Sequence, residues 1–172
     1  MPLLHPMKRA AIIVRDMPAS LAFWRDMIGL RVWAEGRIGP DHPSFHKLLA
    51  VKPCHARYVI LNAPPVALGM VGLFELREPA PTATARRDSE ATLNVGEAVL
   101  VFTCDDIGRI AAAVGSAGLP VLCPPTRFQL PELGIESREM TFRDPNGVAV
   151  NVIEPVSGRN ATGDREQRLD MT

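Results

Sequence analysis

The sequence has little of what marks several specialised classes of protein. Aromatic residues make up 5% of its 172 residues, and Lys plus Arg equals Asp plus Glu at 19 each, so the formal net charge is zero. Nucleic-acid binding usually needs an excess of positive charge or aromatic stacking platforms, and a membrane surface attracts polybasic patches. No run reaches the roughly 18 apolar residues of a membrane span. We therefore expect no nucleic-acid partner and no membrane anchor.

Cysteine is also scarce. Cys54, Cys104 and Cys123 are far apart and form no CxxC pair, which predicts neither a disulfide framework nor a cysteine metal site. We expect Cys104 to pack on the helix-facing side of a strand, and Cys54, in a loop, to be the most exposed thiol. The N-terminal segment lacks the long apolar core of a signal peptide, so we expect a cytoplasmic protein.

One pattern occurs twice along the chain. An apolar strand ends at Asp16, an amphipathic helix of about three turns follows, and Gly29 ends that helix. The same order returns around Asp106 and Gly118. Asp106 follows Asp16 by 90 positions and Gly118 follows Gly29 by 89, which indicates an internal duplication. The helices are expected over 17–28 and 107–117.

Further strands follow each helix, so the predicted order is β-α-β-β-β, twice. The ends of the two copies are similar, since Leu73-Phe74-Glu75 matches Val152-Ile153-Glu154. The strands are expected over 30–33, 56–62 and 67–76, and over 98–102, 120–122, 137–142 and 148–154, with a loop over 39–44 and a short helix over 45–51. We predict a first module over 1–76, a linker over 77–96, a second module over 97–155 and a flexible tail over 156–172.

Three motifs in this order carry a resemblance to a known family. They are the segments Ile12–Val32, Val101–Val121 and Thr141–Pro155. On these motifs the chain resembles the vicinal oxygen chelate superfamily, which includes glyoxalase I, bleomycin-resistance proteins and extradiol dioxygenases. The resemblance implies an α+β fold in which two βαβββ modules form a curled mixed sheet around a central cavity, with the helices outside. It also implies a homodimer.

The resemblance further implies where a metal ion would be held. In metalloenzymes of the family, His or Glu residues on the first and last strand of each module bind a divalent cation. The matching positions in this chain are Arg9, Gly72, Val99 and Asn151. None carries an imidazole or a carboxylate, and an arginine offers no lone pair to a cation. We therefore expect no metal site of the family type and predict no cofactor.

Alternation of side chains along the strands predicts the lining of the cavity. It is expected to be mostly apolar, with one guanidinium, one amide and one hydroxyl. Two interpretations of Arg9 stay open, because a buried charge needs a partner. Arg9 binds a ligand carboxylate, phenolate or phosphate beside Asn151, or it pairs with Glu75, Glu136 or Glu139. Trp33 either caps the cavity mouth or packs in the core. The predicted ligand-binding residues are Arg9, Ile13, Trp33, Val99, Val101, Thr103 and Asn151.

Candidate catalytic residues are few. Glu136 and Glu139 lie near one predicted strand, and either is a candidate general base if it faces the cavity. Arg9 is the candidate oxyanion stabiliser. His42 and His46 have the i, i+4 spacing of a helical metal pair, but Pro43 between them favours solvated loop histidines. An alternative metal site would use His46 and His55.

The sequence leads to three functional hypotheses. The first is a metal-free protein that binds an amphipathic small molecule in the sheet cavity. The second is a lyase, isomerase or dioxygenase of the same superfamily, either metal-free or with non-standard ligands. The third is a catalytically silent structural or regulatory subunit. Fold alone does not decide among them, because one fold serves many reactions.

Overall fold

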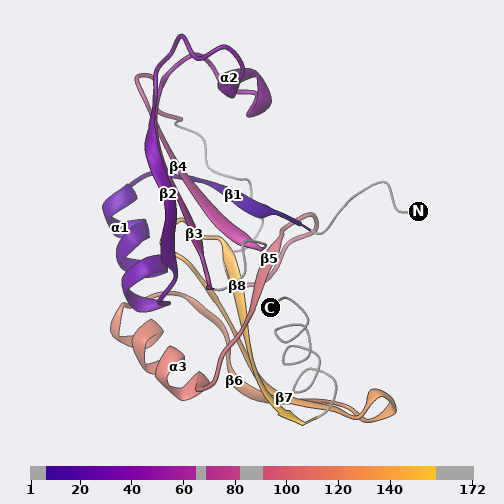
Figure 1. The fold of residues 1–172 in the computed structure, drawn as a ribbon. Helices are drawn as coiled ribbons and strands as arrows, with labels where there is room; N and C mark the ends of the chain where they lie inside the picture. Colours follow the sequence, from indigo (N-terminus) through magenta and orange to yellow (C-terminus); the bar gives the residue numbers. More distant parts are fainter. Residues whose placement is uncertain (1–6, 65–68, 82–90, 158–172) are drawn as a thin grey trace, which may run out of the picture. The chain divides into compact units, whose positions relative to one another are not determined.

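The chain folds as two compact units that divide between residues 86 and 87 (Figure 1). The computed structural model describes residues 7–64, 69–81 and 91–157. Each unit is a βαβββ module with its own four-stranded mixed sheet, which confirms the predicted α+β class. The middle of the expected linker, residues 82–90, and nearly all of the expected tail lie outside the described residues.

Helices and strands are arranged in the same order in both units. In the first unit they are β1 (Arg9–Val14), α1 (Met17–Leu21), η1 (Ala22–Met27), β2 (Arg31–Ile38), α2 (Phe45–Leu48), β3 (His55–Asn62) and β4 (Met70–Arg77). In the second unit they are β5 (Val99–Thr103), α3 (Ile107–Ser116), β6 (Val121–Leu130), η2 (Pro131–Leu133), β7 (Ile135–Arg143) and β8 (Ala149–Ser157).

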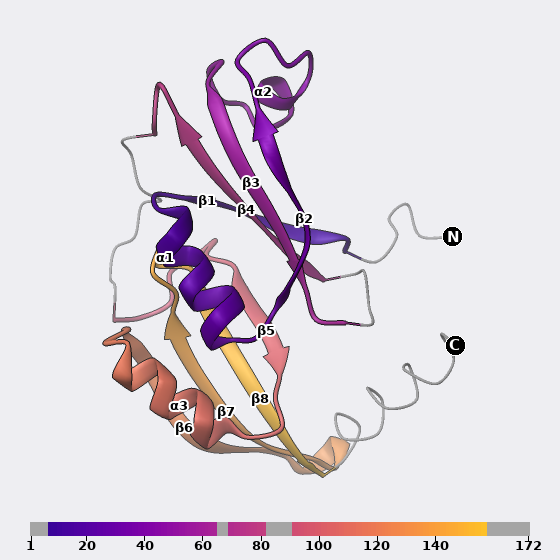
Figure 2. The same ribbon diagram turned by 60° about the vertical axis from the view of Figure 1, so that its left-hand side comes forward.

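The two sheets have the same topology. Their strand orders are β1-β4-β3-β2 and β5-β8-β7-β6. The first strand of each unit runs parallel to the last strand, and the other neighbours are antiparallel (Figure 2). The repeat found in the sequence is therefore a repeat of structure.

Each main helix begins at the aspartate that the sequence indicates. The Asp16 carboxylate accepts a hydrogen bond from the backbone N–H of Ala19 at 2.9 Å, and the Asp106 carboxylate accepts one from Arg109 at 3.1 Å. These bonds satisfy an N–H group that has no partner within the helix. The predicted stops are also confirmed, because Gly29 and Gly118 have φ angles of 91° and 64°, which favour glycine.

A glutamate of the last strand holds the first residue of each helix. Glu75 accepts from the backbone N–H of Met17 at 3.3 Å, and Glu154 accepts from that of Ile107 at 3.4 Å. Each carboxylate also forms an ion pair, Glu75 with Arg77 at 2.9 Å and Glu154 with Arg138 at 3.1 Å. The matching Glu in the two sequence copies thus ties each helix to its sheet.

The core of each unit lies between the sheet and its helix. Along β1, Ile12 and Val14 are buried, whereas Arg9, Ala11 and Ile13 are exposed. The face of each sheet that carries no main helix is called here its open face. The buried side chains on the helix-covered faces are Ile12, Val14, Met17, Leu21, Trp24, Val59, Leu61, Val71 and Leu73 in the first unit, and Ile107, Val114, Met140, Phe142, Val150 and Val152 in the second.

Several elements differ from the prediction. β2, expected over 30–33, continues to Ile38, and β8 continues to Ser157, past the start of the expected tail at 156. The expected helix over 17–28 widens after Leu21 into η1, a π-helical segment in which the N–H of Ile28 reaches the carbonyl of Phe23 at 2.9 Å. The strand expected over 120–122 is β6, which continues to Leu130 and pairs with β7 as a long hairpin. Pro124 does not stop β6, because an edge strand needs fewer backbone donors and the register shifts between Cys123 and Thr126. None of the helices in the described ranges has the length and apolar content for a membrane crossing.

Candidate functional site

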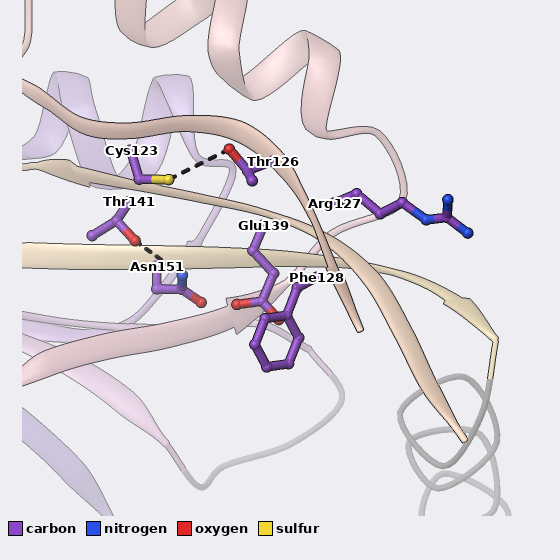
Figure 3. A pocket seen from close by; sticks show the side chains of 7 residues that line it. All are labelled: Cys123, Thr126, Arg127, Phe128, Glu139, Thr141 and Asn151. Carbon is purple, nitrogen blue, oxygen red and sulfur yellow. Dashed lines mark hydrogen bonds between the residues drawn. The ribbon is translucent and has the colours of Figure 1, made fainter. Parts of the chain in front are cut away.

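An open hollow lies on the second sheet. Its volume is about 160 Å³, and it sits on the face opposite to α3. Side chains from β6, β7 and β8 surround it (Figure 3). We call it the second-sheet hollow; its lining residues are Cys123, Thr126, Arg127, Phe128, Glu139, Thr141 and Asn151.

Strand register explains why these side chains meet. Thr141 of β7 lies between Cys123 of β6 and Asn151 of β8, so the three form one row across the sheet. Glu139 lies opposite Thr126 and forms the next row. The irregular register of β6 between these rows bends the edge strand and opens space above β7.

The polar groups of the hollow are held by short local bonds. The Asn151 side-chain amide donates to the Thr141 hydroxyl at 3.1 Å. The Ser137 hydroxyl donates to one oxygen of Glu139 at 2.8 Å. These bonds leave the Asn151 carbonyl oxygen and the second Glu139 oxygen without a protein donor among the described residues of this unit. Two predicted residues, Asn151 and Glu139, therefore come together.

Arg127 and Glu136 form an ion pair at the edge of this region. The two Arg127–Glu136 contacts are 2.9 Å from Nε and 2.6 Å from Nη2. Figure 3 shows the Arg127 guanidinium pointing away from the other lining side chains. Glu136 does not line the hollow, so its candidacy as a general base receives no support from this site.

Three further predicted residues lie on the same face of the second sheet. Val99 pairs with Ala149, Val101 with Asn151 and Thr103 with Ile153 in the parallel ladder of β5 and β8. They do not line the hollow but border it on the side of β5. Val101 is 58% exposed, so an apolar side chain lies open beside the Asn151 amide.

Arg9 and Ile13 lie on the open face of the first sheet. Arg9 is exposed, and its Cδ lies 3.5 Å from the position that a Cβ on Gly72 would take. Among the described residues of this unit Arg9 makes no ion pair, and Glu75 is engaged by Met17 and Arg77. Of the three glutamates considered as partners of Arg9, Glu75 is therefore the wrong one, and pairing with Glu136 or Glu139 stays a prediction.

A short helix fills part of the open face of the first sheet. Phe45 of α2 packs on Phe74 with ring centroids 5.9 Å apart, and Tyr58 lies 6.3 Å from Phe74 on its other side. Phe45 and Phe74 belong to a buried cluster with Cys54, Ala56 and Leu76, against which Tyr58 packs. Figure 1 shows α2 beyond the end of β2, where the chain turns toward β3. No such cluster covers the described part of the second sheet's open face.

The histidines near α2 have structural roles. His42 Nδ1 accepts from the backbone N–H of Phe45 at 3.1 Å. His46 is only 6% exposed, and its Nε2 lies 2.9 Å from the Cys54 carbonyl oxygen. The expectation of solvated loop histidines is therefore wrong for His46, whose ring nitrogen is held by backbone groups. Cys54 is 1% exposed, which also contradicts its expected exposure.

Trp33 does not pack in the core. It lies on β2, where the pairing with β3 shifts between Val32 and Ala34, and it is 52% exposed. The Lys8 ammonium is 5.9 Å from the centre of its ring, within the range of a cation–π contact.

The buried arginine of the second unit was not predicted. The side chain of Arg143, on the open face of β7, is only 1% exposed and forms an ion pair with Glu97. Arg143 also donates to the Thr92 and Gly147 carbonyl oxygens, both at 2.8 Å. The segment before β5 is thereby fixed to the sheet.

The donor set at the four family positions does not fit a divalent cation. The side chains at these positions are a guanidinium cation at Arg9, a hydrogen atom at Gly72, an alkyl group at Val99 and an amide at Asn151. Within the described residues no group of three or more His, Cys, Asp and Glu side chains comes together. His46 and His55 accordingly do not belong to such a cluster.

The β6 residues of the hollow were missed because the strand was expected only over 120–122. The alternation Arg127-Phe128-Gln129-Leu130 is a usable signal, since polar and apolar residues alternate with period two. Thr141 was also predictable, because it lies two residues after Glu139 on the same strand and its side chain therefore points to the same face of the sheet. With the hairpin in place, these residues fall beside Glu139.

Solved structures with the same fold were found by comparison. A glyoxalase family protein from Bacillus cereus has a TM-score of 0.72 at 15% identity, covering 91% of this chain and 97% of that one. A glyoxalase/dioxygenase from Nostoc punctiforme has 0.56 at 18%, covering 89% and 96%. The trypanothione-dependent glyoxalase I of Leishmania major has 0.56 at 14%, covering 98% and 96%. At these identities the likeness shows the fold alone.

The family itself is shown by sequence. No curated protein matches the chain. The model of the Glyoxalase/Bleomycin resistance protein/Dioxygenase superfamily matches residues 6–152, which is most of the 172-residue chain and includes both modules. The chain therefore belongs to the glyoxalase/bleomycin resistance protein/dioxygenase superfamily.

Proposed function

We propose that the protein binds a small amphipathic organic molecule, with the polar end of the ligand in the second-sheet hollow. One observation carries the proposal. The same open sheet face presents exposed apolar side chains, Val101 and Phe128, next to the free polar atoms of Asn151 and Glu139. Ligand sites typically combine an apolar lining with a few placed polar groups.

The size of the hollow limits what it holds. Its volume of about 160 Å³ equals that of roughly five water molecules in the liquid. Pockets that enclose a drug-sized ligand measure about 300–1,000 Å³. The hollow therefore receives a headgroup, and the remaining apolar part of the ligand lies along the strands toward Val101.

The proposal includes a site without a metal ion. Its support is the chemistry of the four family positions, which lack an imidazole or carboxylate. Elemental analysis of protein purified without a chelator tests this part. We expect no stoichiometric Zn, Fe, Ni or Mn, and one bound ion per chain would overturn it.

A neutral amphipath tests the binding site directly. The probe is 2-phenylethanol, titrated into ¹⁵N-labelled full-length protein and followed by amide chemical shifts. We expect the largest shifts at Thr141, Asn151 and their neighbours. Asn151→Leu keeps the approximate volume but removes the amide, so these shifts should shrink. Gln129→Leu makes the same change at an exposed β6 position outside the hollow and should leave them intact.

The titration has clear contrary outcomes. Shifts confined to other regions, or equal responses of Asn151→Leu and wild-type protein, would overturn the proposed site. The amide spectrum of each variant without probe shows whether its fold is retained. A variant that loses dispersed signals would be replaced by Asn151→Ser, which keeps a small polar side chain but shortens it.

A second candidate function is proton transfer by Glu139. The observation that favours it is the free oxygen of this carboxylate, which faces the hollow beside the Asn151 carbonyl oxygen. A base so placed would remove a proton from an acidic carbon of the ligand and return one to it. In D₂O, native protein should then place deuterium on a ligand that co-purifies with it, and Glu139→Gln should not. Absence of exchange leaves binding as the function.

We also propose a homodimer. Its support is the likeness to a family in which paired subunits are common. Native mass spectrometry of the full-length chain measures the subunit number together with any retained organic mass. A monomer at micromolar concentration would contradict the proposed dimer without affecting the hollow.

A further inference from the structure

We infer that the second-sheet hollow selects ligands with a cationic amine headgroup over ligands with an anionic one. The inference rests on the proposed function, because it takes the hollow as the binding site and names the class of ligand. It also reverses the charge expected from the sequence, where Arg9 suggested a ligand carboxylate, phenolate or phosphate.

The charge facing the hollow is negative. Glu139 contributes a carboxylate that points along the open face toward Phe128 and Asn151 (Figure 3). The positive charge in the lining, on Arg127, is directed away from the hollow and engaged by Glu136. Arg143, on the same strand as Glu139, is buried and paired with Glu97. An anionic headgroup would therefore be repelled by the Glu139 carboxylate. Among the described residues of this unit, no unpaired cationic side chain faces the hollow to offset that repulsion.

The hydrogen-bonding groups of the hollow are mostly acceptors. Ser137 already donates to one Glu139 oxygen, which leaves the other oxygen to accept. The Asn151 amide nitrogen donates one of its two N–H groups to the Thr141 hydroxyl, so the Asn151 carbonyl oxygen remains as an acceptor, while the second N–H and the Thr141 O–H remain as donors. The Thr126 hydroxyl donates to the Pro124 carbonyl oxygen at 2.7 Å and lies 3.5 Å from the Cys123 thiol, so one of its lone pairs remains to accept from a ligand.

An ammonium group is the complement of this arrangement. It has three donors and no acceptor, whereas a carboxylate has only acceptors. A hydrogen bond between an ammonium and a carboxylate is charge-assisted and roughly twice as strong as a neutral one. The Phe128 ring, 41% exposed beside Glu139, offers an apolar surface to the carbon skeleton of the ligand. The class of ligand is thus an aryl- or alkylamine that is protonated at neutral pH.

Two probes of matched shape test the inference. We titrate 2-phenylethylamine and 3-phenylpropionate into the full-length protein at physiological salt and follow the amide shifts of the hollow. The amine should bind about tenfold more tightly than the carboxylate, the difference expected when one charge-assisted hydrogen bond is gained. Glu139→Gln should remove most of this preference. Glu132→Gln removes the same charge from the exposed hairpin turn and should not.

The outcomes separate this inference from the proposed function. Equal binding of both probes at the hollow, tighter binding of the carboxylate, or an unchanged preference in Glu139→Gln overturns charge selection while the binding site stands. No shift at the hollow with either probe, together with none from 2-phenylethanol, overturns the site itself. If Glu139→Gln fails to give a dispersed spectrum, Glu139→Asp replaces it; withdrawing the carboxylate by one methylene should lower the preference.

Discussion

Arg143 donates to both carboxylate oxygens of Glu97, 46 residues earlier in the chain. The Arg143 side chain is 1% exposed and that of Glu97 is 12% exposed, so the pair is shielded from water. Glu97 also accepts from the Asn94 backbone N–H at 3.1 Å, which orders the turn before β5. Because a buried guanidinium without a partner is costly, the entry into the second module depends on this contact.

Replacing Glu97 by Ala should therefore destabilise the protein strongly. The change leaves the Arg143 cation buried and without its carboxylate, and we expect a loss of about 3–5 kcal/mol in the free energy of unfolding. Urea denaturation followed by circular dichroism measures it. Asp26→Asn is the control, because Asp26 forms an exposed ion pair with Arg25 and should change stability little. Equal effects of the two variants would show that the buried pair contributes no more than a surface one.

Arg9→Ala should leave the fold intact. Arg9 is exposed and forms no ion pair with the described residues of its unit, so we expect a change in the free energy of unfolding within about 0.5 kcal/mol. The same denaturation experiment reads this out. A loss of several kcal/mol would mean that Arg9 is a structural partner of another charge after all.

The N-cap of α3 should contribute measurably to stability. Asp106→Ala removes the acceptor of the Arg109 N–H, and we expect a loss of about 1 kcal/mol. The preceding Asp105 is exposed and caps nothing, so Asp105→Ala is a control of equal charge change. The melting temperature of Asp106→Ala should lie several degrees below that of Asp105→Ala, because only Asp106→Ala removes a hydrogen bond. Coinciding curves would contradict the capping role.

Two residues of α2 should respond differently to truncation. Phe45 is buried among Phe74, Cys54 and Leu76, and Phe45→Ala should cost about 3 kcal/mol through lost burial and a cavity. Leu48 on the same short helix is 81% exposed, and Leu48→Ala should stay within about 0.5 kcal/mol. Thermal unfolding of both variants checks this. A small effect of Phe45→Ala would show that the helix can leave the sheet at little cost.

The three thiols should react in a fixed order. Burial raises the pKa of the Cys104 thiol, more than the hydrogen bond from the Asp106 backbone lowers it, so its thiolate fraction at about pH 8 is below that of an ordinary cysteine. Cys123, which lines the hollow, should be alkylated first, then Cys104, and Cys54 only on unfolding. Peptide mass spectrometry after timed iodoacetamide treatment gives the order. Raising the pH should increase the alkylation rate of Cys104, because more of its thiol becomes thiolate. Rapid labelling of Cys54 in the native protein would contradict its burial.

Local signals in the sequence predicted the helices well. Asp16 and Asp106 were recognised as N-caps, and Gly29 and Gly118 as helix ends, because capping depends on residues within one turn. The match of Glu75 with Glu154 indicated the repeat, but the sequence did not predict the hydrogen bond that Glu75 accepts from Met17. The duplication made the family resemblance, and with it the fold, readable from one sequence.

Long-range contacts were the part that the sequence did not reveal. The contact of Arg143 with Glu97 spans 46 positions, and no local pattern marks it. Arg9 occupies a family ligand position, which made it a site candidate, but its side chain is exposed. The prediction ended the strand of β6 at 122, whereas β6 continues through Pro124 and Pro125, which an edge strand tolerates and which only the sheet order reveals.

The aromatic cluster beneath α2 makes the two copies of the duplication differ in how well they tolerate amino-acid substitutions. Substitutions at Phe45 or Phe74 alter the packing on which the first copy depends, so selection for stability limits them. Thr141 and Asn151 contact each other on a face whose described residues form no such cluster. New binding preferences can therefore arise in the second copy by exchanging a few side chains, while the first copy keeps the stability margin that absorbs their cost.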